Sequence, residues 1–432
     1  MFIRILNSEM ELATGCTEPG AVALTAAEAG QALRKAGVDK AEEITVNASI
    51  NIIKNAMSAG IPGTDYEGMD YAAAIGALGG DPIYLLEVMN HVPRETVEAA
   101  AALVKAGKVK VNVAQVPQKL YIEVIAKGGG HTGRAIVRDL HTNVVLVEQD
   151  GAATLDKRDT DTAAAGDSDV VSPEQIASFL TVRSIWDYCT KELDPMHDPI
   201  DIIRSAVQVN SVISDEGLSK EYGLAIGRNL DLNCRKGLMT RDLTTNSMIA
   251  AAAGADARMA GAPVSVVANS GSGNQGITCS VPLIEYAKEL HSGKEKLYRA
   301  LIISNLVAIH EKTGIGTLSA YCGAVSAGAG AGAGIVYLCG DGYQAAIHTV
   351  VNALAIVSGI VCDGAKASCA AKIASSVDAA LLGYNMYKCN QEFKGGDGIV
   401  MKDIETTIKG IGRLGKDGMR QTNEEIIRLM MS

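Results

Sequence analysis

The spacing of apolar side chains changes twice along the chain, from helical to strand-like and back to helical. Residues 94–107 form an amphipathic pattern of helical period, and β-branched residues then crowd four short runs that turn residues separate. Such runs indicate strands, whereas the helical period that resumes at Ser172 indicates helices as far as the C-terminus. The four runs are residues 109–114, 120–126, 133–140 and 143–149.

These elements predict an α+β fold, in which a large, mainly helical domain carries a smaller antiparallel-sheet α/β lobe inserted near the N-terminus. We assign residues 41–151 to the lobe and residues 1–40 and 165–432 to a discontinuous helical domain. Residues 152–164 are rich in charged side chains, which is typical of a solvated linker. The helical domain should contain long helices over residues 175–191, 200–213, 245–259 and 285–313.

Composition limits what the core can be made of. Aromatic residues make up only 4% of the 432 residues, whereas 47% are hydrophobic and 46 are glycine. The core must therefore consist of aliphatic side chains on closely packed helices. Residues 313–340 carry no charge, but glycine alternates with alanine there, and a membrane span usually needs about 20 strongly apolar residues. We interpret this stretch as a buried helix or loop of small residues.

Charge and cysteine usage narrow the class of protein. The net charge is −10 and no basic patch is present, which argues against nucleic acid as a partner. The first residues lack the apolar segment of a signal peptide, and nine cysteines are an odd number for a disulfide framework. We therefore expect a cytoplasmic protein with no membrane contact, whose cysteines are catalytic, metal-binding or buried. The possibility that the protein forms a homo-oligomer stays open.

A first candidate for chemistry is Cys16 in the stretch TGCTEPG, residues 14–20. Thr17 is a plausible helix cap, so Cys16 should precede a helix N-terminus, where the helix dipole lowers the pKa of a thiol. A thiolate at this position could act as a base or a nucleophile. Equally, Cys16 could be a buried turn cysteine beside a structural glycine.

A second candidate is the polar, glycine-rich loop of residues 269–276. Its backbone amides could cradle an anion, and its side chains could hold a carboxylate. The loop lacks the lysine of a P-loop and the GxGxxG of a dinucleotide site, which disfavours nucleotides. Its candidate binding residues are Asn269, Ser270, Ser272, Asn274 and Gln275. His131, which follows three glycines, could bind a carboxylate or shuttle a proton, or could simply be a solvated turn histidine.

Three further cysteines, Cys322, Cys362 and Cys369, lie among glycine, alanine and serine. Their spacing matches neither a ferredoxin pattern nor a zinc pair. They could be small buried hydrophobes, but our hypothesis is that they hold one iron–sulfur cluster with one iron left open to substrate. Cys279 is either a fourth ligand or part of a pocket wall. We interpret the remaining cysteines, Cys189, Cys234, Cys339 and Cys389, as structural.

Together the Cys16 stretch, the segment SGSGNQG at residues 270–276 and the three late cysteines resemble the L-cysteine desulfidase family, which is related to the α chain of iron–sulfur L-serine dehydratases. The resemblance implies a [4Fe-4S] cluster, no pyridoxal phosphate, and conversion of L-cysteine to hydrogen sulfide, ammonia and pyruvate. It implies that Cys322, Cys362 and Cys369 are the cluster ligands and that Cys16 is the proton acceptor.

The same resemblance places the loop of residues 269–276 in the substrate pocket, and we expect Thr17, Glu18 and His131 to bind the small amino-acid substrate with it. Two alternatives stay open. One is dehydration of L-serine at the same site. The other is a non-catalytic relative that binds an amino acid without a cluster.

Overall fold

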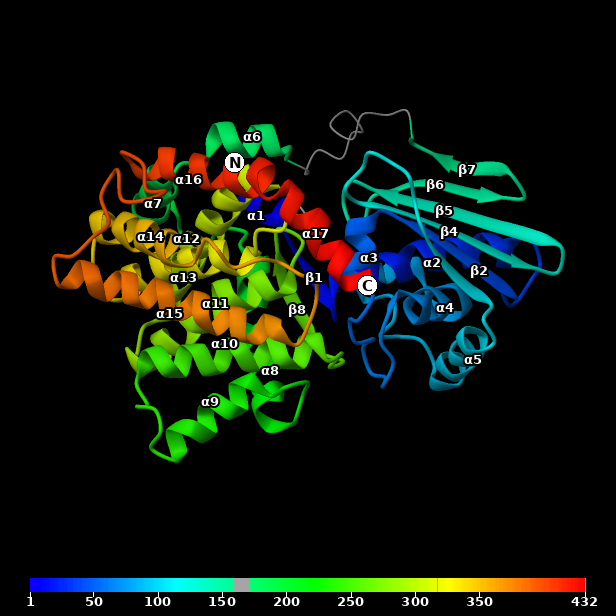
Figure 1. The fold of residues 1–432 in the computed structure, drawn as a ribbon, viewed down its shortest axis with the longest axis horizontal. Helices are drawn as coiled ribbons and strands as arrows, with labels where there is room; N and C mark the ends of the chain where they lie inside the picture. The colour runs from blue at the N-terminus through cyan, green and yellow to red at the C-terminus, as the bar shows by residue number, and fades with distance from the viewer. Residues whose placement is uncertain (159–170, 317, 432) are drawn as a thin grey trace.

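The computed structural model describes residues 1–158, 171–316 and 318–431. Two parts lie side by side, a large helical domain and a smaller lobe built on a sheet (Figure 1). The predicted α+β class, with a mainly helical domain and a smaller sheet lobe, is confirmed. The division of the chain into domains differs from the prediction at two places, α2 and β7.

The sheet of the lobe has six strands in the order β3-β2-β4-β5-β6-β7. Neighbouring strands are antiparallel except for β2 and β3, which pair in parallel. The helices that separate these two strands along the chain supply the crossover that a parallel pair requires. The strands are β2 (Glu43–Ala48), β3 (Val109–Val113), β4 (Tyr121–Gly128), β5 (His131–Arg138), β6 (Val144–Gln149) and β7 (Ala152–Asp156).

Helix α2 (Thr17–Lys35) packs in the lobe, whereas we had assigned residues 1–40 to the helical domain. Its alanines share one buried core with β2, β4 and β5 on one side and with α4 (Met69–Gly79) on another. A side chain at Gly133 or at Gly76 would clash with the backbone of α2, so glycine is needed for this close packing. Burial on both faces explains why α2 joins the lobe.

The short helix α1 (Phe2–Glu9) and strand β1 (Met10–Thr14) do belong with the helical domain. β1 pairs with β8 (Ser265–Asn269) in a two-stranded antiparallel sheet. The chain therefore passes from the helical domain into the lobe between Thr14 and Thr17. This crossing places Cys16 at the boundary of the two parts.

Strand β7 corrects the predicted linker of residues 152–164. Its register with β6 runs from Leu146 opposite Asp156 to Gln149 opposite Ala152, so backbone pairing orders a segment whose composition indicated a solvated loop. Residues 159–164 of the predicted linker lie outside the described residues.

The helical domain is built around α13 (Gly323–Leu338), which is buried along almost its whole length. Its glycines allow close approach: a side chain at Gly328 would lie 2.7 Å from the backbone of Ser376 in α15, and one at Gly330 would clash with Ser304 in α12. The uncharged stretch is thus a buried small-residue helix, as predicted. Across the described residues, no helix has the length and apolar character needed to cross a bilayer.

Two predicted helices are broken in the structure. The helix expected over residues 175–191 stops at Phe179 and restarts after Thr181, because Thr181 and Ser184 form a capping box. The helix expected over residues 285–313 is interrupted after Glu289, where His291 adopts a positive φ of 49°.

The remaining elements surround these two cores (Figure 1). They are α3 (Ile50–Ala56), η1 (Pro82–Glu87), α5 (Arg94–Lys105), α6 (Pro173–Phe179), α7 (Val182–Asp187), η2 (Tyr188–Glu192), α8 (Asp201–Ser219), α9 (Ile226–Arg235), α10 (Leu243–Met259), α11 (Gly273–Glu289), α12 (Lys294–Ile315), α14 (Tyr343–Val357), α15 (Ser368–Lys388), α16 (Ile404–Arg413), η3 (Leu414–Gly418) and α17 (Arg420–Met431).

Candidate active site

A small cavity of about 110 Å³ lies where the lobe meets the helical domain. The start of α2, the turn before α11, and the segments that precede α13 and α15 all contribute to its wall. The cavity brings together Cys16 and the three late cysteines, which the sequence separates widely. Of the predicted binding residues, it is lined by Thr17, Glu18, Ser270, Ser272, Asn274 and Gln275.

Local backbone structure positions the three late cysteines. Cys322 caps α13, and its amide donates to the carbonyl of Ile360, while the amide of Cys362 donates to the carbonyl of Ala320 at 2.7 Å. These bonds form a short bridge between the two segments. Cys369 lies in the first turn of α15, and its thiol is 3.5 Å from the carbonyl of Gly364.

The donor set is of the kind that an iron–sulfur cluster uses, because cysteine thiolates are the usual protein ligands of such clusters. Cys322, Cys362 and Cys369 line one cavity, so the chain has three such groups to offer there.

Two of these thiols have a raised pKa, which favours their protonated form. Burial and the neighbouring Cys362 sulfur raise the pKa of Cys322 to about 12, and burial also raises the pKa of Cys369. Two buried lysines, Lys54 on α3 and Lys312 on α12, lie within electrostatic reach of these sulfurs. A ligand that converts the thiols to thiolates would release their protons, and the two ammonium groups would offset the resulting negative charge.

Cys16 belongs to a separate hydrogen-bonded group. Its thiol donates to Oε2 of Glu18 at 2.9 Å, and the amide of Asn55 donates to Oε1 of the same carboxylate at 2.8 Å. His141 Nε2 lies 3.9 Å from Glu18 Oε1, too far for a hydrogen bond but close enough for an ion pair. Burial opposes ionisation of Glu18, but these three neighbours hold its pKa below the usual range. Glu18 in turn outweighs burial and raises the pKa of His141.

The predicted effect of the helix dipole on Cys16 is wrong. Cys16 is the N-cap of α2, as the sequence indicated, but burial and the negative charge of Glu18 raise the pKa of its thiol well above the usual value. The dipole acts weakly beside full desolvation and an adjacent carboxylate. Cys16 therefore carries its proton until a change in the site removes it.

The turn between β8 and α11 forms another part of the cavity wall. Ser270 has a φ of 47° and Gly271 a φ of 74°, which turns the chain sharply before α11 begins. The Thr17 hydroxyl donates to the carbonyl of Gly271 at 2.9 Å and joins this turn to the start of α2. Asn269 is buried beneath the turn with its amide 2.9 Å from Asn305 Oδ1, so it supports the wall without lining the cavity.

Buried polar atoms without hydrogen-bond partners gather at this cavity. Five of its lining side chains carry such an atom: Asn55 Oδ1, His141 Nε2, Arg258 Nε, Asn274 Oδ1 and Gln275 Oε1. A buried polar group without a partner is unfavourable, so clustering of these atoms indicates a place for a polar ligand. The sequence analysis did not identify His141 or Arg258. A lone arginine after the alanine run of α10 was the available signal for Arg258.

Two other candidates lie elsewhere. His131 is half-buried at the β4–β5 hairpin, where its ring bonds Asp150 at 2.8 Å, so the structure does not bring it to the cavity with the other predicted binding residues. Cys279 is fully buried in α11, with its sulfur 3.9 Å from the carbonyl of Ala327, and does not line the cavity.

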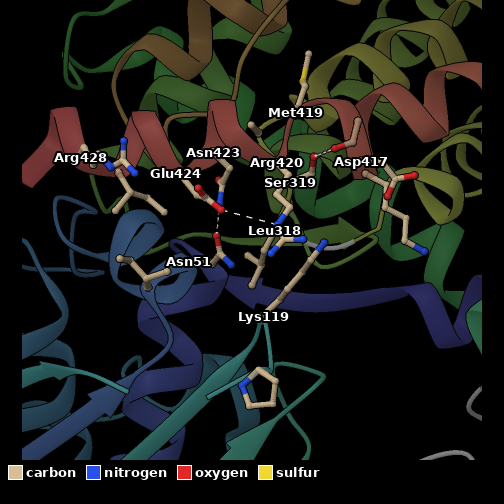
Figure 2. A pocket seen from close by; sticks show the side chains of 16 residues that line it. Asn51, Lys119, Leu318, Ser319, Asp417, Met419, Arg420, Asn423, Glu424 and Arg428 are labelled. Carbon is tan, nitrogen blue, oxygen red and sulfur yellow. Dashed lines mark hydrogen bonds and ion pairs between the residues drawn. The ribbon is translucent and has the colours of Figure 1, made fainter. Parts of the chain in front are cut away.

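A larger groove of about 890 Å³ adjoins the cavity and shares Leu318 and Ser319 with it. Figure 2 shows Asn423 of α17 facing Asn51 of α3 across this groove, and their side chains hydrogen-bond at 2.9 Å. Asn423 also accepts a hydrogen bond from Lys54 at 2.8 Å, and Lys54 lies 3.4 Å from the carbonyl of Cys362. A short chain of polar contacts thus links the groove to the cysteines.

The fold and the cavity define an α+β protein in which thiols and buried polar side chains line one small cavity. The family model described as serine dehydratase alpha chain matches residues 23–428. The chain belongs to this serine dehydratase alpha chain family, as its resemblance to relatives of that family led us to expect. The family's description indicates a lyase.

Relatives extend the match along the whole chain. A UPF0597 protein of Oleidesulfovibrio alaskensis is 42% identical over 431 residues, which cover 100% of this chain and 97% of the relative. UPF0597 proteins of Desulfitobacterium hafniense and Treponema denticola are likewise 42% identical and cover 100% of this chain, with 96% and 97% of their own lengths matched.

Proposed function

We propose that the protein is an iron–sulfur-dependent carbon–sulfur lyase that converts L-cysteine to hydrogen sulfide, ammonia and pyruvate. One observation carries the proposal: three cysteines, a buried thiol–carboxylate pair and five unpartnered polar atoms line the same small cavity. The unpartnered atoms suit the charged groups of a small amino acid.

Cys322, Cys362 and Cys369 would hold the [4Fe-4S] cluster, and the proposal involves no pyridoxal phosphate. When bound, a cluster with three protein ligands supplies a Lewis-acidic iron beside the leaving group of the substrate. Lys54 and Lys312 would hold positive charge next to the three thiolates.

The chain's own residues handle the proton. Cys16 accepts the Cα proton of the substrate only as a thiolate, so its own proton must leave first. That proton leaves to solvent, because the Glu18 carboxylate, which accepts the hydrogen bond of the thiol at 2.9 Å, has a pKa far below that of Cys16 and only positions the thiol. Asn55 and His141 hold that carboxylate in place. Loss of the Cα proton and the β-sulfur leaves aminoacrylate, whose tautomer is hydrolysed by water to pyruvate and ammonia.

L-Serine dehydration is the second candidate, and the family to which the chain belongs favours it. The two substrates differ only in the leaving group, so the same residues would serve both. The test is to reconstitute the protein anaerobically, measure its iron and sulfide, and compare kcat/KM for L-cysteine and L-serine by pyruvate release.

We expect a higher kcat/KM for L-cysteine. A higher value for L-serine would replace the desulfidase proposal with the dehydratase. A reconstituted protein that binds no iron would refute both and leave a non-catalytic amino-acid-binding protein.

A further inference from the structure

Arg258 is a buried cation at the cavity, and no ion pair joins it to an acidic side chain of the described residues. It lies near the end of α10, is only 2% exposed, and lines the cavity. Its Nε has no hydrogen-bond partner among the described residues. Arg299 of α12, by contrast, is paired with Glu295.

An arginine in this state needs a ligand. Burial of a charge is costly unless the charge is paired, and the planar guanidinium is suited to bind a carboxylate through two parallel hydrogen bonds. The anion must come from the cavity, because that is the space that Arg258 faces.

The start of α11 is shaped around the same side chain. Gly273 is the first residue of this helix of 17 residues, and a Cβ atom there would clash with Nε of Arg258. Because residue 273 is glycine, the guanidinium of Arg258 can lie next to the N-terminal amides of α11. These amides and the helix dipole also favour an anion, so two independent elements direct positive potential to one spot.

We propose that Arg258, assisted by the N-terminus of α11, binds the α-carboxylate of the substrate and so restricts the site to free amino acids. This inference rests on the proposed function, since it takes the cavity as the substrate site. Amides, esters and amines that lack the carboxylate would be excluded. The anchored carboxylate also directs Cα toward Cys16, because the thiol, its Glu18 partner and Arg258 line one small cavity.

A binding comparison tests this assignment directly. L-Alanine and L-alaninamide differ in the carboxylate and have no leaving group, so calorimetry with the anaerobically reconstituted protein measures binding without turnover. Wild type should bind L-alanine roughly 10²-fold more tightly than the amide, the effect expected of a buried charge pair. Arg258→Gln should lose this preference, and Arg258→Lys should keep part of it. Arg228→Gln, at the surface of α9, is the matched control and should behave as wild type.

A second variant guards against a folding defect. Gly273→Ala keeps the charge of Arg258 but displaces its guanidinium, so it should weaken L-alanine binding and leave the weak amide binding unchanged. Kinetics give a further readout: in Arg258→Gln the KM for L-cysteine should rise far more than kcat falls.

The outcomes separate the anchor from the lyase. A wild type that does not prefer L-alanine, or an Arg258→Gln variant that keeps the preference, overturns the anchor even if L-cysteine is still converted. Carboxylate-dependent binding that requires Arg258, in a protein that releases neither sulfide nor pyruvate, supports the anchor and overturns the lyase.

Discussion

The two sides of the cavity differ in how their charges are matched. The proton side, made of Cys16, Glu18, Asn55 and His141, centres on a carboxylate that a thiol, an amide and an imidazole surround. The sulfur side, made of Cys322, Cys362 and Cys369, has the buried lysines Lys54 and Lys312 within electrostatic reach of Cys322 and Cys362.

This difference indicates how the site is divided. The proton side holds its carboxylate by contacts within the chain, whereas on the sulfur side a bound metal cluster would have to displace the thiol protons. Substitutions on the sulfur side should therefore change what the protein binds, and substitutions on the proton side should change only what it does.

The largest effect should come from the sulfur side. Cys322→Ser replaces a thiolate ligand at the cap of α13, and we expect loss of nearly all cluster absorption, iron and pyruvate formation. Iron and sulfide analysis after anaerobic reconstitution measures this. The control variant Cys279→Ala removes a buried cysteine outside the cavity, and the protein should still bind its iron. Equal iron in Cys322→Ser and wild type would show that Cys322 is not a ligand.

On the proton side, Cys16→Ala should lower kcat by about 10²–10⁴-fold, the usual contribution of a positioned general base. Iron content should stay at the wild-type value, since Cys16 lies with the proton side. Full turnover in this variant would remove Cys16 from the reaction, and loss of iron would break the division between the two sides.

A smaller effect, with a definite direction, concerns the pKa of Cys16. Burial raises that pKa most, and Glu18 raises it further through its charge and its hydrogen bond, so Glu18→Gln should lower it. Alkylation of Cys16 by iodoacetamide, followed by mass spectrometry of its peptide, should then begin at lower pH. If kcat/KM rises with pH as Cys16 ionises, any remaining activity of Glu18→Gln should rise at lower pH too.

Glu11→Gln is the control for this shift. Glu11 lies near His141 and does not touch the Cys16 thiol, so its loss should leave the reactivity of Cys16 unchanged. A pKa of Cys16 that stays the same in Glu18→Gln would mean that burial alone sets it.

The sequence predicted those site residues whose type and immediate neighbours indicate their chemistry. Cys16 before a helix and three cysteines among small residues could be recognised, and the structure places all four at one cavity. The dipole argument for Cys16 failed because burial, which depends on the tertiary fold, dominates the pKa.

Other parts of the site depend on contacts that local sequence does not encode. Arg258 resembled any basic residue in the last turn of a helix, where the dipole alone would explain it. His141 lies in an ordinary turn, and only the fold brings it against Gly271. Helix α2 is buried on more than one face, so it lacks the single apolar stripe that would have indicated its partner.

The smallest expected effect tests the link between the two parts. Asn423→Ala removes the hydrogen bonds to Asn51 and to the buried ammonium of Lys54. Among the described residues, Lys54 then keeps the carbonyl of Cys362 at 3.4 Å. We expect a loss of about 1–2 kcal/mol in the free energy of unfolding, seen as a lower urea midpoint, because a bond to a buried charge is lost.

The control is Thr422→Ala, exposed on the same helix, which should change the free energy of unfolding by less than about 0.5 kcal/mol. Asn423→Ala can be compared with Thr422→Ala for iron content as well. If only Asn423→Ala retains less iron, then Lys54 of α3 connects the groove to the sulfur side. An unchanged urea midpoint would instead mean that water replaces Asn423 at Lys54 without cost.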